Sequence, residues 1–187
     1  MKKNIIIFII VFVGYLVGNS IYLQAIKDPT PGKAKRLACQ KRVTAFEKSF
    51  DNKEIKKAQS LLKSGDVYFI SSAKKAIYAK SKLFNYVSLK DADNIFQKEL
   101  DTYKKSKSIA KEKLKLIYSI YENDIKDPGK KTKKSKLYAG YIWLEIKNKD
   151  NKLIYKVQID FMDKKGGDIA QTLKCCIKSF ATYTQSK

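Results

Sequence analysis

The sequence contains few of the side chains that usually carry out catalysis or hold a metal ion. It has no histidine, and histidine is the most common general base and the most common metal ligand in proteins. Its 18 acidic residues form no recognised carboxylate, nucleophile or metal-binding motif. We therefore predict that the protein is not an enzyme and that it holds neither a cofactor nor a metal ion.

The three cysteines are the remaining candidates for metal or redox chemistry. Cys175 and Cys176 are adjacent in a predicted helix, so their side chains point about 100° apart and cannot hold one ion together. Cys176 falls on the apolar stripe of that helix, and Cys39 falls on the apolar stripe of the first predicted helix. Cys39 and Cys176 are therefore either buried free thiols or a disulfide, and the disulfide requires an exported domain.

The loop Lys164–Asp168 contains two glycines and comes directly before the last predicted helix. Backbone N–H groups and a helix N-terminus favour anions. However, the loop lacks the spacing of a phosphate-binding or dinucleotide-binding motif, and the carboxylate of Asp168 would repel an anion. We expect a plain turn here.

The chain is strongly basic, with a net charge of +22 and an isoelectric point near 9.8. Of its 40 basic residues, only Arg36 and Arg42 are arginines. Lysine is a hydrated point charge, whereas arginine is the planar fork that reads base edges and clamps phosphates. The composition therefore predicts attraction to anionic surfaces without sequence readout. Abundant Lys, Ile and Asn are also typical of codon bias, but the electric field acts whatever its origin.

The segment Lys130–Lys136 has the densest charge in the chain and contains no acidic residue. Like charges repel, so we predict an extended, solvated loop. Tyr141 and Trp143 follow it, on the face of a predicted hairpin opposite the main apolar face. We expect another helix to cover that face; the alternative is an exposed aromatic patch beside the lysines. The predicted contact residues for an anionic partner are Lys130, Lys131, Lys133, Lys134, Lys136, Tyr141 and Trp143.

The spacing of apolar residues predicts a predominantly helical α+β domain over residues 33–187. A seam from Phe96 to Tyr121 repeats at alternating spacings of four and three, which predicts one long helix over residues 89–126 that packs within the chain. The third predicted helix opens with Val67–Ile70, which also has strand character. The other predicted helices cover residues 33–49, 52–63, 66–87 and 168–182.

One β-hairpin is predicted over residues 137–162, because apolar and polar residues alternate in both of its strands. A two-residue turn at Asp150-Asn151 would place Leu144 opposite Val157 and Glu145 opposite Lys156, which is a favourable cross-strand pair. An isolated hairpin is marginally stable in water, so one of its faces must pack on helices.

An apolar run over Ile5–Ile26 follows Lys2 and Lys3. A short uncharged core led by lysines is typical of a secretory signal peptide, and small residues precede a possible cleavage position. If it is not cleaved, the run is long enough to cross a bilayer as a single-pass anchor. A buried helix of a soluble domain is the third alternative.

The expected organisation is a signal peptide or transmembrane anchor over residues 1–26, a linker over 27–32 and a single basic domain over 33–187. We expect export to the cell envelope, either to the periplasm or to the outer face of the inner membrane. Lysine counts on the two sides of the apolar run favour a cytosolic domain instead, but long domains translocate largely regardless of charge.

These observations lead to three functional hypotheses. The first is a non-enzymatic envelope protein that binds anionic polymers, lipid head groups or an envelope protein. The second is a nucleic-acid-binding protein without sequence specificity, acting in uptake or transfer. The third is an enzyme with no recognisable motif.

Overall fold

The computed structural model describes residues 36–105 and 112–184. The predicted signal peptide or anchor and the linker lie outside these residues. Within them, no helix has both the length and the apolar character needed to cross a membrane. Residues Arg36–Tyr183 form one compact unit, and the account below concerns that unit.

The unit is built on a five-stranded sheet with the strand order β1-β5-β4-β3-β2. β2 and β3 are parallel, and every other neighbouring pair is antiparallel. The strands are β1 (Ala45–Ser49), β2 (Val67–Lys74), β3 (Leu114–Glu122), β4 (Gly140–Lys147) and β5 (Leu153–Phe161).

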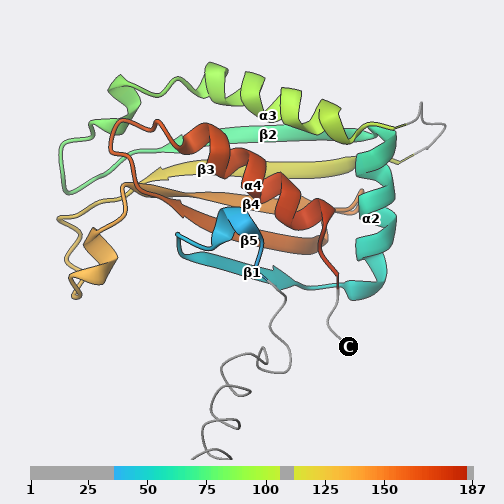
Figure 1. The fold of residues 1–187 in the computed structure, drawn as a ribbon, viewed down its shortest axis with the longest axis horizontal. Helices are drawn as coiled ribbons and strands as arrows, with labels where there is room; N and C mark the ends of the chain where they lie inside the picture. The colour runs from blue at the N-terminus through green and yellow to red at the C-terminus, as the bar shows by residue number, and fades with distance from the viewer. Residues whose placement is uncertain (1–35, 106–111, 185–187) are drawn as a thin grey trace, which may run out of the picture. The chain divides into compact units, whose positions relative to one another are not determined.

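The helices of the described residues lie on one face of this sheet (Figure 1). They are α2 (Asn52–Ser64), α3 (Leu89–Tyr103) and α4 (Ile169–Ala181). Three short 3-10 helices lie elsewhere in the described chain: η1 (Ala38–Gln40) before β1, η2 (Leu83–Asn85) before α3 and η3 (Lys134–Lys136) between β3 and β4. α3 and α4 run along the sheet, and α2 crosses one end of it (Figure 1). The core fills the space between the helices and the inward-facing side chains of the strands.

Alternating side chains of the central strands supply most of the core. In β3, Leu116, Tyr118 and Ile120 are fully buried, and the residues between them face the other side of the sheet. The ring of Tyr118 stacks on Phe96 of α3 with ring centroids 4.5 Å apart. Its hydroxyl donates a hydrogen bond of 2.5 Å to Asp93 of the same helix, so the core tyrosine keeps a polar partner.

The predominantly helical fold class predicted from the sequence is wrong, and the largest error is the helix over 89–126. α3 ends at Tyr103, and Leu114–Glu122 is the strand β3. The helical spacing of apolar residues that begins at Phe96 continues through Leu114. The segment from Leu114 onward also alternates with the period of two that is typical of a strand, and Leu114 is an apolar position in both patterns. Pairing with β2 and β4 satisfies the backbone of this segment in the sheet.

Two other predicted helices are also wrong. The segment 33–49 contains η1 and the edge strand β1, in which Phe46 is 63% exposed instead of buried on a helical stripe. The segment 66–87 contains β2 and a loop, as the β-branched and aromatic residues at its opening had suggested.

Locally signalled elements are found close to where they were predicted. α2 begins after Asp51, whose carboxylate accepts the Glu54 N–H, and it ends at Gly65, which adopts a left-handed φ of 78°. The C-terminal helix begins after Asp168, although this carboxylate accepts N–H groups of Met162 and Asp163 instead of capping the helix.

The predicted pairing within the hairpin is confirmed, since Leu144 lies opposite Val157 and Glu145 opposite Lys156. The turn is wider than predicted. A bulge follows Ile146, and Asn148 accepts hydrogen bonds from the turn backbone through its side chain, while Asn151 alone of the turn residues has a positive φ. The bulge changes only the pair next to the turn, Lys147 with Leu153. The pairs from Ile146 onward, away from the turn, keep the predicted register.

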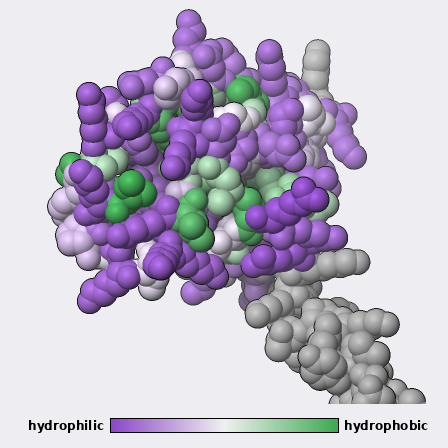
Figure 2. Space-filling view, turned by 60° about the vertical axis from the view of Figure 1, so that its left-hand side comes forward, coloured by the Kyte–Doolittle hydropathy of each residue, from purple (hydrophilic) through white to green (hydrophobic). Residues whose placement is uncertain are grey.

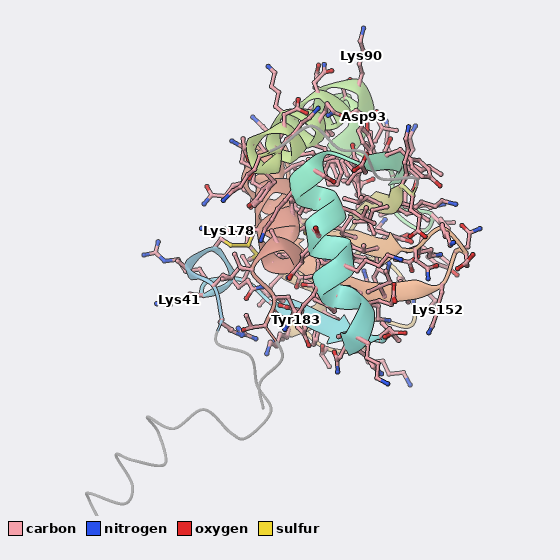
Figure 3. The ribbon with its side chains drawn as sticks, turned by 90° about the vertical axis from the view of Figure 1, so that its right-hand side faces the viewer. Lys41, Lys90, Asp93, Lys152, Lys178 and Tyr183 are labelled. Atoms are coloured by element: carbon pink, nitrogen blue, oxygen red, sulfur yellow. A yellow bond between two sulfur atoms is a disulfide. The ribbon has the colours of Figure 1, made fainter. Side chains whose placement is uncertain are left out.

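A disulfide joins η1 to α4, but its partners are Cys39 and Cys175, so the Cys39–Cys176 disulfide, one of the two alternatives for these cysteines, is wrong. Figure 3 shows this bond between the two elements. The prediction failed because it placed Cys39 on a core-facing helix. η1 instead lies over the outer side of α4, where Cys175 is within reach, and Cys176 is a free thiol buried in the core.

Candidate anion-binding surface

Three connecting segments meet at the end of the sheet opposite α2: residues 75–88, 123–139 and 162–168 (left in Figure 1). We call these three segments the loop end. β2, β3 and β5 finish at this end and β4 begins there, because Glu122 pairs with Gly140 and Gly140 with Phe161. Segments far apart in the sequence are therefore neighbours; a Cβ added at Gly166, for example, would overlap a Val87 methyl group and lie 3.4 Å from a Leu83 methyl group.

The loop end contains eleven lysines and four aspartates. Each aspartate accepts hydrogen bonds from backbone N–H groups, and none of the four forms an ion pair with a lysine of the described residues. The acidic charges therefore organise the loops, while the loop-end lysines other than the half-buried Lys130 are exposed. A large positive charge without local neutralisation is what attracts an anionic surface.

Two carboxylates at the end of β3 fix the conformation of the first segment. Asp124 accepts the N–H groups of Ile77 and Tyr78 at 2.6 and 2.5 Å, and that of Ala79 at 3.1 Å. Glu122 accepts the N–H groups of Ala76, Lys82 and Leu83 at 2.7 to 3.2 Å. Because these backbone groups turn inward to the carboxylates, the loop has a defined shape without regular secondary structure.

The pKa values of the same two groups follow from these contacts. Burial raises the pKa of both carboxyls, but the accepted backbone hydrogen bonds outweigh it and hold both pKa values below their ordinary values. Both groups are therefore charged at neutral pH. The carboxylates act as loop clamps, and their hydrogen-bonding capacity is largely used by the protein itself.

The loop end also exposes large apolar side chains. Ile77 is 87% exposed and Leu137 is 67% exposed, and Tyr78, Tyr86, Ile125 and Met162 are exposed as well. Figure 2 turns this end toward the viewer and shows apolar patches set among hydrophilic side chains. Apolar tips surrounded by lysines are typical of a surface that enters the boundary of a membrane.

A hollow of about 560 Å³ lies between the first two segments. Its walls are largely apolar, and five exposed lysines from all three segments stand around it. The apolar lining residues are Ala76, Ala79, Leu83, Ile125, Tyr138 and Ala139. The lysines are Lys80, Lys82, Lys126, Lys136 and Lys164, and Glu122 and Asn123 complete the lining.

The predicted lysine segment is part of the loop end, but it is not an extended loop. Thr132 and Ser135 hydrogen-bond to each other's backbone, and η3 forms a turn over Lys134–Lys136. Lys131, Lys133 and Lys134 are exposed, and Lys136 borders the hollow.

Lys130 differs from the other four predicted lysines because it is half-buried. Its ammonium group donates to Asn123 and lies 5.6 Å from the centre of the Tyr138 ring. Burial lowers the pKa of Lys130, opposed by the charges of Asp127 and Asp124. This lysine supports the loop from inside.

Tyr141 and Trp143 alternate along β4 with buried residues, so they lie on the opposite face of the sheet. That face carries none of the described helices (Figure 1). The expectation that a helix covers them is wrong within the described residues. Instead, Tyr141 stacks on Tyr121 with centroids 4.6 Å apart, and burial raises its pKa to about 12. Trp143 donates to Glu145 and has the Lys156 ammonium 4.7 Å from its ring centre.

Sequence reasoning missed the contribution of the first segment, which it assigned to a helix, and of Ile125, Leu137 and Met162. The segment Lys74–Lys82 carries four lysines, and only Ile77 within it falls on the apolar stripe of the predicted helix, which was the available signal. The glycine loop Lys164–Asp168 is a turn, as expected, in which the N–H groups of Lys165 and Gly166 bond to Asp163.

Among residues 36–105 and 112–184, no cluster of three or more cysteine or acidic side chains has the arrangement of a metal site. The free thiol of Cys176 is fully buried, and burial raises its pKa well above the ordinary value, so it is a poor nucleophile. No protein-family model, curated protein or solved structure matches the chain.

Proposed function

We propose that the protein is a non-enzymatic component of the cell envelope whose basic domain docks on an anionic lipid surface through the loop end. The observation that carries this proposal is the combination of eleven lysines with six exposed large apolar side chains at one end of the sheet. Each lysine near an anionic membrane contributes roughly 1 kcal/mol, so several acting together give useful affinity.

The apolar side chains favour lipid over a soluble polyanion. A polymer or nucleic acid neutralises lysines but gains little from isoleucine and leucine at the tips of loops, whereas a bilayer takes both. The Asp124 clamp supports this role, because it turns the backbone of Ile77 and Tyr78 inward and leaves their side chains outside. A pre-formed loop pays less ordering entropy on binding.

The test follows hydrogen exchange of the full chain with vesicles of phosphatidylglycerol and, separately, of phosphatidylcholine. The apolar N-terminal run is common to both samples, so the informative signal is confined to the domain. We expect residues 76–80 and 131–137 to be protected by the anionic vesicles only, and the protection to weaken steeply with salt. Protection that is equal with both lipids, or absent at low salt, overturns the proposal.

Two matched lysine variants separate location from net charge. Replacing Lys131, Lys133, Lys134 and Lys136 with Gln should abolish most of the protection. Replacing Lys53, Lys56, Lys63 and Lys105 with Gln removes the same charge at the end bearing α2 and should leave it intact. Lys130 is kept in both because it is packed against Asn123 and Tyr138.

A nucleic-acid-binding function is the alternative outcome. If single-stranded DNA protects the loop end at salt concentrations at which anionic vesicles do not, the lysines serve a nucleic acid and the lipid proposal is wrong.

A further inference from the structure

We infer that the hollow at the loop end is a binding site for an amphiphilic anion, that is, an alkyl chain with one phosphate or carboxylate head. Its volume of about 560 Å³ falls within the range of roughly 300 to 1,000 Å³ that is typical of small-molecule sites. This inference adds to the docking proposal a defined ligand and a defined place for it, and it is tested independently of vesicles.

The polar groups that line the hollow restrict what the body of the ligand can be. The Asn123 amide is fully engaged, since its N–H groups donate to the carbonyls of Ser135 and Tyr138 and its oxygen accepts from Lys130. The Glu122 carboxylate accepts backbone N–H groups of the first segment through both oxygens. These contacts leave both residues little capacity for a sugar or a nucleoside. Apart from the Tyr138 hydroxyl and the surrounding lysines, the other lining residues are apolar, so the hollow suits an apolar ligand body.

The walls support the same conclusion. Alanine methyl groups, Leu83, Ile125 and the Tyr138 ring surround the space, and apolar walls gain from contact with an alkyl chain in proportion to the area removed from water. The small side chains of Ala76 and Ala79 are what keep the hollow open. A bulky residue at either position would fill it.

The rim sets the charge of the ligand's head. Lys80, Lys82, Lys126, Lys136 and Lys164 come from three separate segments, and none of them forms an ion pair with a described residue. Five ammonium groups around one opening repel each other, and an anionic head relieves that repulsion. A cationic or neutral head has no such gain.

The ligand's source is either a lipid drawn partly out of the membrane or a free amphiphile such as a fatty acid. Both present the same chemistry to the hollow. Decyl phosphate is a suitable probe because it has two matched controls. Decanol lacks the anionic head, and inorganic phosphate lacks the alkyl chain.

The experiment is an NMR titration of the full 21.5 kDa chain, following amide signals of residues 76–83 and 123–139. We expect decyl phosphate to bind at least tenfold more tightly than either control. Ala79→Phe should weaken the binding of decyl phosphate at least tenfold, because the new side chain fills the hollow. Ile125→Ser should weaken the binding by a smaller factor, and it replaces the first variant in the test if Ala79→Phe does not fold. Equal affinity for decyl phosphate and inorganic phosphate overturns the inference, because the alkyl chain of the ligand then contributes nothing to binding.

A second pair of variants tests the rim. Replacing Lys82, Lys136 and Lys164 with Gln should weaken decyl phosphate and leave decanol unchanged, whereas replacing Lys53, Lys56 and Lys63 should affect neither. If both triple variants weaken the probe equally, only net charge matters and the rim has no role.

The outcomes for the hollow and for membrane docking are distinguishable. If Ala79→Phe loses decyl phosphate but keeps full protection by anionic vesicles, the hollow takes free amphiphiles. Loss of both assigns it to membrane lipid. Failure of decyl phosphate to shift the loop-end signals, with vesicle protection retained, removes the hollow and leaves the docking proposal standing.

Discussion

Glu122 and Asp124, two residues apart at the end of β3, hold the two halves of one loop. Glu122 accepts N–H groups of Ala76, Lys82 and Leu83, at the two ends of the loop, and Asp124 accepts those of the tip between them. The loop has no regular secondary structure of its own. Its shape, and hence the placement of its lysines and apolar tips, depends on two acidic side chains in an otherwise basic region.

The first prediction concerns the Asp124 clamp. Asp124→Asn should increase hydrogen exchange at residues 77–79 roughly tenfold or more at neutral pH, because charge-assisted hydrogen bonds are replaced by weaker ones. Exchange at β4 should be unchanged. Thr132→Ala, which alters a neighbouring turn, is the control. Unchanged exchange in Asp124→Asn would show that the loop holds its shape without the carboxylate.

The same clamp predicts a pH dependence. The folded pKa of Asp124 lies below its ordinary value of 3.8, so its contribution is complete above that value and is lost as the pH falls through the folded pKa. The difference in unfolding free energy between the parent and Asp124→Asn should therefore be constant at neutral pH and shrink under acid conditions. Urea unfolding at several pH values measures it, and a difference that grows as pH falls contradicts the assignment.

Glu47 should behave in the opposite way. Burial raises its pKa above the ordinary value of 4.5, although the hydrogen bond that the Gln40 amide donates to its carboxylate opposes the shift. The folded protein therefore favours the protonated form, and stability is lost as the pH rises through the folded pKa. Glu47→Gln stays neutral and keeps an acceptor for Gln40, so it should be more stable than the parent at neutral pH. This advantage should vanish below pH 4.5, and urea unfolding at several pH values measures it.

The disulfide assignment predicts different effects for adjacent cysteines. Cys175→Ala should lower the free energy of unfolding by roughly 3 to 5 kcal/mol, because the bond closes a loop with a sequence separation of 136 residues. Cys176→Ala should keep the disulfide and lose only packing, roughly 1 kcal/mol. Thiol titration of the unfolded variants checks the pairing: one free thiol in the parent, none in Cys176→Ala and two in Cys175→Ala. A disulfide that survives in Cys175→Ala would refute it.

The sequence predicted what short-range patterns determine. The hairpin pairs Leu144 with Val157 because both strands alternate and are joined by a short turn, and α2 lies between a capping aspartate and a glycine. β3 could not be predicted in the same way. Its residues satisfy a helical spacing and an alternating spacing, and only its partners, β2 and β4, decide between them. Pairing β2 with β3 in parallel requires a crossover through α3 that no local signal announces.

The candidate surface shows the same division. The lysines of Lys130–Lys136 were found because they lie close together in the sequence. Lys82 and Lys164 are 82 residues apart, and they border the same hollow only because β2 and β5 both finish at the loop end. Tyr141 and Trp143 were grouped with the lysines by sequence proximity. The alternation along β4 puts them on the open face of the sheet instead.

The final prediction tests the packing that holds the loop end to the sheet. Gly140 begins β4, and a Cβ added there would overlap the carbonyl oxygen of Tyr121 and the ring of Phe161. The first of these is backbone in the paired strand β3, and the second is a fully buried core side chain, so neither has room to move. Gly140→Ala should therefore cost roughly 2 to 3 kcal/mol of unfolding free energy. Gly129→Ala is the matched control, because its Cβ would meet only the Asp127 side chain, at 3.2 Å, on an exposed turn. Urea unfolding of both variants gives the comparison, and equal stability of the two would mean that β3, β4 and β5 do not approach one another as closely at this edge as described.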